Sequence, residues 1–521
     1  MSAVPDVNRG RLGQCYRVAL QSDGFSHKEN CVVVVGSGPA GAAAALSLIE
    51  KGVDVTLIEA GPERAAFGLT ARVAGVTLTR IHRPLSPRHD GVVFTGDPST
   101  VLFEDVAPGG LTNHWSCAVP RFSHDDFTDA RRAGEAFEWP VGYDDLASWY
   151  DWVEPRLCIS GSPIDVPQLP AGKVTDARTL AQSWQPIAED AQRGGQAIVP
   201  VPYVYGARTT VTLSGTVFNS FVRLIKPVLR SRYLSVRFDA QAIQLEWSGQ
   251  TRRVTAVIVR HPQTGTTSRI PCRAVVVAAG SVNTTKLLLQ STNSDFPEGL
   301  GNTHGVLGRY LHDHPLGKLM VDLGAPLSFQ PAAYVTRLPL EGSVPLYAAA
   351  CLQWSGVQSV AKSVLTGRPG QLTSCGFSVF GTMAPSEDNL VALDHEQTRT
   401  DGTPGLRLHI NYPPESTTAL TDARDRLLDL LDRAKLRPRT HLWLVDAVGS
   451  AIHFAGTCRM HASPRFGMLD AWSRLHAVPN VIVADSSAFT TGPEKNPVLT
   501  AMALAARAGD RLAEDLRAGV V

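Results

Sequence analysis

The first strong pattern along the chain is a series of short apolar runs separated by a glycine-rich turn and an apolar stretch. Residues 31–35 form an apolar, mostly β-branched run, and the glycine-rich segment 36–41 follows at once. An alanine- and leucine-rich stretch, 42–51, comes next, and a second apolar run, 53–58, ends in Glu59. Short apolar runs bounded by turn residues predict buried strands, and the longer stretch predicts a helix. Together they predict a β-α-β unit.

A second group of apolar runs lies far along the chain. Two β-rich runs, 253–260 and 269–279, flank a short polar turn, and the second closes on valines and Gly280. Near the C-terminus, 481–485 is another short apolar run, and 497–516 carries apolar residues on one helical face. These runs predict further parts of the domain that begins with the β-α-β unit.

Apolar and polar residues alternate in the stretches between these two groups. The alternation is clearest at 346–354, 373–383 and 406–412. It predicts strands of an antiparallel sheet with one covered face.

The chain of 521 residues is long enough for two domains. We predict an α/β fold, with a discontinuous nucleotide-binding domain of Rossmann type and an α+β second domain that holds the antiparallel sheet. The predicted pieces are 25–130, 206–324 and 446–521 for the first domain, and 131–205 and 325–445 for the second.

Composition and charge exclude several classes of protein. There are 49 Lys+Arg against 48 Asp+Glu, so the chain lacks the basic surface that nucleic-acid binding needs. Residues 1–30 hold no apolar segment typical of a secretion signal, and the uncharged stretch 31–49 is too rich in glycine for a membrane helix. Eight cysteines without a C-x-x-C pair indicate reduced thiols. We therefore expect a cytoplasmic protein with neither a nucleic-acid nor a membrane partner.

The glycine-rich segment carries the first candidate chemistry. Gly36 suits a tight turn, Gly38 lets a pyrophosphate approach the backbone, and Gly41 lets helix and strand pack closely. The following helix N-terminus offers N–H groups and a partial positive charge to phosphates. Glu59 stands where an acid would bond the hydroxyls of an adenosine ribose. The pattern predicts a dinucleotide site but does not distinguish FAD from NAD.

A second glycine-rich loop spans 109–117. Its glycine pair, Gly109 and Gly110, permits close approach of the backbone to a ligand. Taken alone, the loop is more simply a turn that happens to hold His114 and Trp115.

His453 and Asn496 form the candidate catalytic pair. Oxidation of an alcohol by hydride transfer needs a base for the hydroxyl proton, and a neutral imidazole suits that role. An asparagine amide can hold the same hydroxyl. Asn496 followed by Pro497 also predicts a helix N-cap with proline at the first helical position, which would aim a positive helix end at a reduced flavin. For His453 alone, a hydrogen-bonded core histidine is the simpler interpretation.

His312 and His314 lie two residues apart and would share a face of an extended segment. Such a pair can ligate a metal, but no third ligand stands nearby at metal-binding spacing. We therefore expect no metal, and a structural or substrate-domain role for this segment.

Together these motifs resemble the glucose–methanol–choline (GMC) oxidoreductase family, from about Cys31 to Arg517. One departure is His461, where the family usually has glycine. The resemblance implies bound FAD, a substrate domain over the flavin, and catalysis by His453 paired with Asn496. The motifs that carry it are 36–41 with Glu59, 109–110, 275–280, 453–460, and 485–487 leading to 496–500.

The resemblance also implies a set of residues that contact FAD. His114 stands in the register of a flavin-linked histidine, so a covalent bond there is one expectation, and simple contact with the ring is the other. The implied set is Gly36, Gly38, Pro39, Ala40, Gly41, Glu59, Ala60, Gly109, Gly110, Thr112, Asn113, His114, Ser116, Ala242, Ala279, Gly280, Asp485, Ser486, Pro497 and Thr500.

Within the family, the chain looks most similar to pyranose oxidases and bacterial glycoside oxidases. The 109–117 loop, the segment from Trp139 to Tyr150 and asparagine at 496 carry this likeness. It implies oxidation of a secondary ring hydroxyl of a pyranose or glycoside, C3 favoured over C2, with electrons passed to O2 (giving H2O2) or a quinone. A downstream glycoside-cleaving enzyme would then use the keto-sugar.

Four tryptophans are candidates to stack on a sugar, although each alone is more simply a core residue. They are Trp115, Trp139, Trp149 and Trp354. Several alternatives stay open: oxidation of a non-sugar alcohol, a flavin lyase without redox turnover, a flavin-binding protein without turnover, and NAD in place of FAD.

Overall fold

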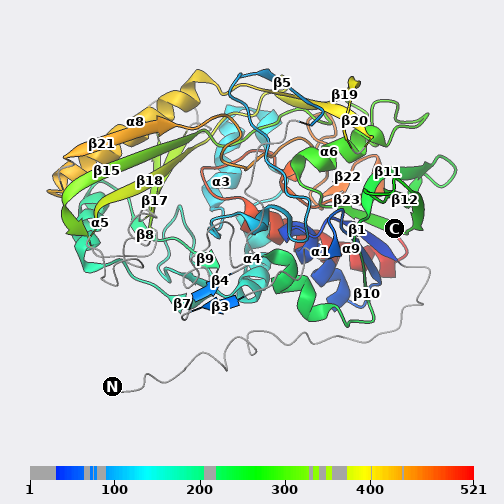
Figure 1. The fold of residues 1–521 in the computed structure, drawn as a ribbon, viewed down its shortest axis with the longest axis horizontal. Coiled ribbons are helices and arrows are strands. Elements are labelled where there is room, and N and C mark those ends of the chain that lie inside the picture. Colours follow the sequence, from blue (N-terminus) through cyan, green and yellow to red (C-terminus); the bar gives the residue numbers. More distant parts are fainter. Residues whose placement is uncertain are drawn as a thin grey trace.

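The fold is seen in a computed structural model, and two sheets of different kinds dominate it. In Figure 1 a mostly parallel sheet with α1 and α9 lies on the right, and an antiparallel sheet lies on the left beneath α8. The structure describes residues 31–63, 71–73, 76–78, 90–204, 219–327, 333–339, 348–354, 372–400, 402–436 and 439–521.

The predicted β-α-β unit is confirmed. Strand β1 (Val32–Val35) pairs in parallel with β2 (Val55–Ile58), and α1 (Pro39–Glu50) connects them. Within the described residues the sheet has the order β10-β2-β1-β14-β23-β22, so it draws strands from well-separated parts of the chain. Its other strands are β10 (Leu234–Arg237), β14 (Ala274–Val277), β23 (Val478–Val483) and the antiparallel β22 (Arg474–Leu475).

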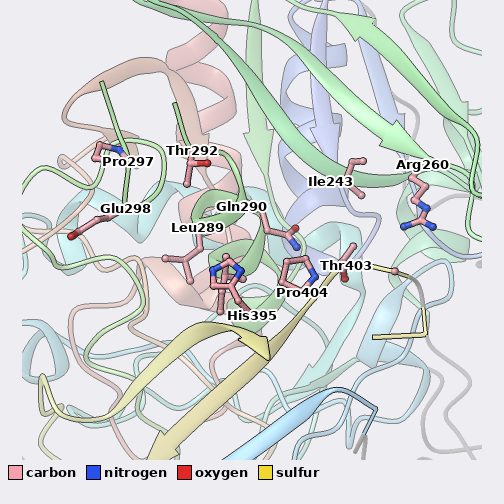
Figure 2. Close-up of a pocket in the computed structure, with 12 residues that line it drawn as sticks. Ile243, Arg260, Leu289, Gln290, Thr292, Pro297, Glu298, His395, Thr403 and Pro404 are labelled. Carbon is pink, nitrogen blue, oxygen red and sulfur yellow. The ribbon is translucent and has the colours of Figure 1, made fainter. Parts of the chain in front are cut away.

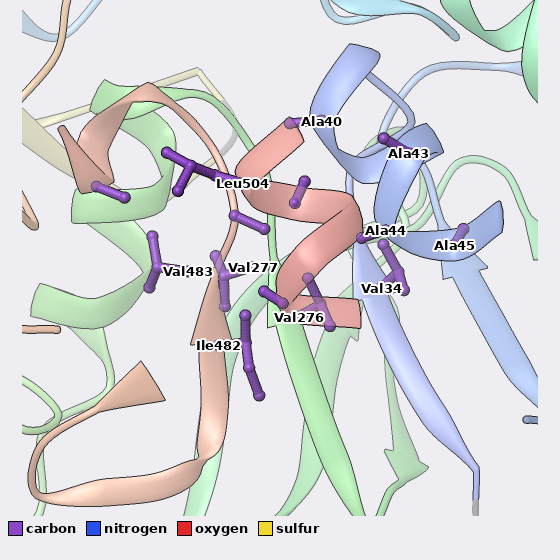
Figure 3. Packing of buried hydrophobic residues seen from close by; sticks show 14 of the residues in the cluster. Val34, Ala40, Ala43, Ala44, Ala45, Val276, Val277, Ile482, Val483 and Leu504 are labelled. Carbon is purple, nitrogen blue, oxygen red and sulfur yellow. The ribbon is translucent and has the colours of Figure 1, made fainter. Parts of the chain in front are cut away.

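Helices α1 and α9 (Val498–Arg517) pack closely on this sheet. Figure 3 shows Ala44 of α1 and Leu504 of α9 above the valines of β14. Gly509 keeps the two helices close, because a Cβ there would lie 3.0 Å from the carbonyl oxygen of Ala44. The Ser47 hydroxyl also donates to the carbonyl oxygen of Ala506 at 2.8 Å. Small side chains therefore allow the middles of the two helices to pack in close contact.

The predicted antiparallel sheet is also present. Its order among the described residues is β21-β15-β18-β17-β16-β8, and its pairs are antiparallel. Helices α8 (Pro414–Arg433) and α5 (Gln185–Arg193) cover one face, with Trp184, Phe377 and Leu427 in the core between. The strands are β21 (Thr440–Val445), β15 (Leu316–Leu327), β18 (Leu372–Gly381), β17 (Ala348–Trp354), β16 (Ala333–Pro339) and β8 (Ile198–Pro200).

One predicted strand belongs elsewhere. The alternating run 406–412 falls in β20 (Pro404–Ile410), which pairs with β19 (Leu390–Thr398) and, in parallel, with β5 (Val92–Gly96). Its buried leucines pack with Leu102 and Leu311 and not against α8. Alternation marks one apolar face but does not say which sheet that face joins. The predicted domain boundaries remain a prediction.

The remaining elements are further helices and the strands of smaller sheets. Among the described residues, no helix is long and apolar enough to cross a membrane. These elements are β3 (Ala71–Val73), β4 (Val76–Leu78), α3 (His124–Thr128), α4 (Tyr143–Leu157), β6 (Ile159–Gly161), β7 (Val174–Ala177), β9 (Tyr203–Val204), β11 (Gln241–Ser248), β12 (Arg253–Arg260), β13 (Thr267–Pro271) and α6 (Ser281–Gln290).

Candidate active site

The predicted dinucleotide glycines fall into two groups according to what a side chain would meet. Gly36 has a φ of +96°, and a Cβ there would lie 2.5 Å from the Ala278 carbonyl oxygen. A Cβ on Gly41 would collide with the carbonyl of Gly36. In contrast, a Cβ on Gly38 or Gly280 would meet no heavy atom of the protein within 4 Å, as far as the described residues show. The first group packs the fold together, and the second faces open space.

This open space fits FAD. A Cβ on Gly110 would have Gly38 Cα as its nearest neighbour at 4.0 Å, so the two glycine loops lie side by side next to it. The N-terminus of α1 directs N–H groups to the same place, which suits a pyrophosphate. Gly38, Pro39 and Ala40 would hold the pyrophosphate there.

Glu59 is held by a residue that the sequence reading missed. Ser37 donates to its carboxylate from the hydroxyl at 2.5 Å and from the backbone at 3.2 Å, and Gly61 N donates at 2.7 Å. Ser37 Oγ also accepts from Gly109 N at 3.1 Å. Burial raises the pKa of Glu59. Ser37 thus ties the fingerprint to the second loop, and its place inside Gly-Ser-Gly was the signal available.

The second loop is organised by Asp105. Asp105 Oδ2 accepts from Asn113 Nδ2 at 2.9 Å and lies 3.0 Å from His114 Nε2. Asn219 donates to the Asn113 side-chain oxygen and to the Pro108 carbonyl. Neither residue was predicted from the sequence. Asn219 lies far along the chain, and Asp105 lies outside the 109–117 loop. The loop is therefore a hydrogen-bonded structure and not a simple turn.

His453 and Asn496 come together, 43 positions apart in the chain. Asn496 Nδ2 lies 3.4 Å from His453 Nε2, so the amide can donate to an unprotonated ring nitrogen. The ring of Phe380 stacks on His453 at a centroid distance of 5.9 Å, and the ring of His314 stands at 74° to it, 4.9 Å away. Burial lowers the pKa of His453 to about 4. The imidazole is therefore neutral at pH 7 and able to accept a proton.

The backbone of His453 is held by the buried segment 312–314. Asp313 Oδ1 accepts from His453 N at 2.9 Å. Burial raises the pKa of Asp313 to about 7 and lowers that of His312 to about 4. His312 Nε2, Asp313 Oδ2, His314 Nδ1 and His453 Nδ1 are buried and have no hydrogen-bond partner among the described residues. Four such atoms on neighbouring side chains leave hydrogen-bonding capacity that the described residues do not fill and that a polar ligand or water can use.

The loop before α9 differs from the prediction at its end. Pro497 is the N-cap and the helix begins at Val498, so Asn496 is not the cap. Its amide faces His453 because the loop is anchored elsewhere. Fully buried Lys495 bonds Asp126 at 2.6 Å, and the Trp139 indole donates to Thr491 at 2.8 Å. These anchors fix the side chain of Asn496 toward the histidine.

The tryptophan prediction is corrected in one case. Trp139 is buried and packs against Phe127 and Phe489, so it is a core residue and not a sugar platform. Trp115 and Trp149 are partly buried against the main core, and the side chain of Trp354 lies outside the described residues.

The other predicted cofactor residues take varied positions. Asp485 accepts from Gly280 N at 3.0 Å and from Thr284 at 2.5 Å, so it braces the Gly280 turn next to Ala279. The hydroxyls of three more are bonded within the protein: Thr112 to Gly109 O, Ser486 to Phe454 O, and Thr500 to Tyr150. Ser116 is exposed, Ala60 is half-buried after β2, and Ala242 lies in β11, which starts beside Glu59.

A separate cavity of about 520 Å³ lies between α6 and the β19–β20 pair (Figure 2). Leu289, Gln290, His395 and Thr403 are among its lining residues. It shares no residue with the pair His453 and Asn496. Among the described residues, no group of three or more His, Cys, Asp or Glu side chains is arranged to hold a metal ion.

Known protein families and individual proteins are similar to this chain. The model described as FAD dependent oxidoreductase matches 31–127, and two GMC oxidoreductase models match 134–316 and 385–505. The chain is 27% identical to 2-methyl-1,2-propanediol dehydrogenase of Mycolicibacterium austroafricanum, over 92% of this chain and 94% of that protein. It is 23% identical to C-glycoside 3-oxidase of Arthrobacter globiformis, over 94% and 96%.

Among solved structures, pyridoxine 4-oxidase from Mesorbium loti has a similar fold. The TM-score is 0.59 at 18% identity, and the match covers 94% of this chain and 99% of that one. This likeness supports the α/β architecture with its antiparallel sheet. The family models, the relatives and the fit of the glycine-lined space to FAD agree with one another. The chain therefore belongs to the GMC oxidoreductase family, as an FAD-dependent enzyme that acts on CH–OH donors.

Proposed function

We propose that this enzyme oxidises a secondary ring hydroxyl of a pyranose sugar or glycoside to the keto-sugar, at C3 in preference to C2. The observation that carries the proposal is the contact between His453 and Asn496, 3.4 Å apart, in a cluster with unpartnered polar atoms. A substrate with several hydroxyls suits such a lining, because each buried donor or acceptor needs a partner. The name C-glycoside 3-oxidase, borne by relatives that match along most of their length, supports the same substrate class.

In the proposed mechanism His453 is the base and Asn496 its partner. His453 takes the hydroxyl proton of the substrate at Nε2, while the Asn496 amide donates a hydrogen bond to the same oxygen. Bound FAD supplies the acceptor for the hydride that leaves the carbinol carbon. Asp313 holds the His453 backbone in place, and burial keeps the ring neutral and ready to accept the proton.

His114 either carries a covalent bond to the flavin or lies against the ring without one. Its Nε2 lies 3.0 Å from Asp105, so a bond at Nε2 would have to replace that contact. Acid precipitation tests the bond: flavin that stays in the protein pellet marks a covalent link, and flavin in the supernatant rules it out.

Oxygen, giving H2O2, or a quinone is the proposed electron acceptor. A ketone at C3 acidifies the proton at C2, so a glycoside-cleaving enzyme is the proposed user of the product, in the cytoplasm.

A non-sugar alcohol is the second candidate substrate. It is favoured by the relative named 2-methyl-1,2-propanediol dehydrogenase, which is a small diol enzyme by name. Anaerobic bleaching of the flavin by glucose, O- and C-glycosides, and simple alcohols tests both, with NMR of the product to fix the carbon. Bleaching by simple alcohols alone would overturn the sugar proposal. A flavin that no alcohol bleaches would indicate a lyase or a binding protein instead.

A further inference from the structure

His314 is a second imidazole beside the proposed base, and the proposed mechanism leaves it without a task. Its ring centroid lies 4.9 Å from that of His453, at an angle of 74°. Phe380 packs across both rings, nearly parallel to His453 and nearly perpendicular to His314. The side chain of His314 thus lies in the same aromatic corner as the group that would face the reacting hydroxyl.

The His314 ring is buried and lacks the hydrogen bonds that a structural histidine makes. It is 3% exposed, and its Nδ1 has no hydrogen-bond partner among the described residues. Its Nε2 lies on the side of Gly492, where a Cβ would come within 3.7 Å. A buried polar atom without a partner costs free energy, so a persistent one in a native site calls for an explanation. A ligand group that bonds it only in the complex is such an explanation.

The neighbouring His312 provides a contrast. Its Nδ1 lies 3.0 Å from the carbonyl oxygen of Tyr310, and its ring lies against Gly456, where a Cβ would come within 2.6 Å of Cε1. His312 therefore fills a tight space and has a structural bond. Each ring keeps one nitrogen without a partner among the described residues, but His314 packs against the ring of His453 and lacks a bond like the one between His312 Nδ1 and Tyr310.

The distance between the His314 and His453 rings suits two hydroxyls on neighbouring carbons of one substrate. Such oxygens lie roughly one hydrogen bond apart, about 2.8 Å. Two imidazoles in edge-to-face contact can each meet one of them, while Asn496 shares the first oxygen with His453. A neutral imidazole can both donate and accept, so it can bond a hydroxyl in either sense.

We propose that His314 binds the hydroxyl next to the one that is oxidised and so selects vicinal diols over simple alcohols. This rests on the proposed function, in which His453 receives the proton of the reacting hydroxyl. It makes His314 a specificity-determining residue for sugars and 1,2-diols alike.

The test compares paired substrates in matched variants of the FAD-loaded enzyme. The pairs are methyl β-D-glucopyranoside with its 2-deoxy and 4-deoxy analogues, and 1,2-propanediol with 1-propanol. The variants are His314→Phe, which keeps the ring shape without polar atoms, His314→Gln, which restores a polar group, and His312→Gln as the neighbouring control. The readout is the second-order rate constant of anaerobic flavin reduction.

The wild type should prefer at least one parent substrate over its deoxy partner by roughly 10- to 100-fold, as expected for one satisfied buried hydrogen bond. His314→Phe should lose that factor on the parent and leave the deoxy analogue unchanged, so that the ratio falls toward one. His314→Gln should recover part of the ratio. His312→Gln should keep the wild-type ratio even if it lowers both rates, because a structural loss affects both members of a pair.

Other outcomes separate this inference from the proposed function. If His314→Phe slows parent and deoxy substrates equally, His314 acts only on the position of His453 and the inference is wrong. If sugars leave the wild-type flavin oxidised but 1,2-propanediol reduces it, the sugar proposal fails and the propanediol pair decides on His314. If only simple alcohols reduce the flavin, or nothing does, both proposals fail. Should His314→Phe not retain FAD, a second apolar variant, His314→Leu, takes its place, and a wild-type ratio there overturns the inference.

Discussion

At the scale of single residues, burial sets the chemistry of the site. His453 and His312 are held neutral because burial removes the water that would stabilise a charged imidazole, and the same burial raises the pKa of Asp313. A base that is already neutral needs no activation by a carboxylate. The proposed role of His453 therefore depends on access to the substrate and on the direction that Asn496 and Asp313 impose.

Replacement of His453 by alanine should slow flavin reduction by roughly two to four orders of magnitude, the range for loss of a general base. FAD should still bind, because the residue lies outside the glycine-lined space. Stopped-flow reduction under anaerobic conditions measures the effect, with flavin absorbance of the purified variant as the control. Reduction at the wild-type rate would remove His453 from the mechanism.

The pH dependence of flavin reduction should reflect the lowered pKa of His453. Because that pKa is about 4, the ring is neutral at pH 6 to 8. The titration of His453 itself should therefore not change the rate of flavin reduction in this range. It should fall on acidification as the ring takes a proton near pH 4. His314 and Asn496 face the ring, and Asp313, which accepts from the His453 backbone N–H, has a pKa of about 7 and is the neighbouring group that titrates near neutrality. In Asp313→Asn any change near pH 7 should vanish while the acid limb remains.

At the scale of elements, loops at the ends of strands and helices carry the site. The turn after β1, the loop 109–114 and the turn at Gly280 lie around the space that fits FAD. Ser37 joins the first two by accepting from Gly109 N, and Asp485 braces the third by accepting from Gly280 N. The loop before α9 is locked by the buried pair of Lys495 and Asp126. Each loop is thus stabilised by a contact from a distant part of the chain.

Two glycines in the first loop should respond oppositely to substitution. Gly38→Val places a side chain in the open space, so it should keep the thermal stability of the apoprotein but lose FAD. Gly41→Ala meets the carbonyl of Gly36, so it should lower the stability of the apoprotein itself. Differential scanning fluorimetry of the apoproteins and flavin content of the purified proteins distinguish the two. A Gly38→Val protein with full flavin content would contradict the assignment of the space.

Glu59→Ala should also weaken FAD retention. The change removes the carboxylate that Ser37 and Gly61 N hold in place after β2. The dissociation constant of FAD for the reconstituted apoprotein measures the loss. Unchanged FAD affinity with reduced turnover would argue against a binding role.

At the scale of the whole molecule, buried neutral histidines make stability depend on pH. The pKa of His312 is about 4 in the folded state against 6.5 when unfolded, so the unfolded chain binds more protons between these values. Its contribution is fully present above pH 6.5 and is lost as pH falls through 4. The difference corresponds to roughly 3 kcal/mol. Asp313 acts in the opposite sense, because its raised pKa costs stability as pH rises through about 7.

The free energy of unfolding should therefore fall from pH 6.5 to pH 4 less steeply in His312→Gln than in the wild type. Urea midpoints at pH 4.5 and pH 7.5 give the comparison, with an exposed-histidine variant, His304→Gln, as the control that should keep the wild-type slope. Equal slopes in all three proteins would show that His312 titrates normally.

The sequence alone predicted the chemistry-bearing motifs and the architecture. The β-α-β unit, the antiparallel sheet and the family followed from local patterns, because strand runs, glycine turns and motif spacing are written in neighbouring residues. The pair of His453 and Asn496 was also predicted, first as candidates from their chemistry and then from the resemblance to the family. The structure brings the two side chains within 3.4 Å.

Other features were decided by tertiary structure alone. The membership of β20 in a separate sheet, the core position of Trp139, Ser37 and Asp105 as centres of hydrogen bonding, and the placement of His314 against His453 depend on residues far apart in the chain. An alternating run such as that of β20 has one apolar face in any sheet, so the pattern does not say which sheet it joins. In the same way, the sequence does not say whether a histidine bonds a carbonyl, a substrate or no partner. Only the packing of distant segments chooses among these states, because it decides which surfaces lose water and which polar atoms keep a partner.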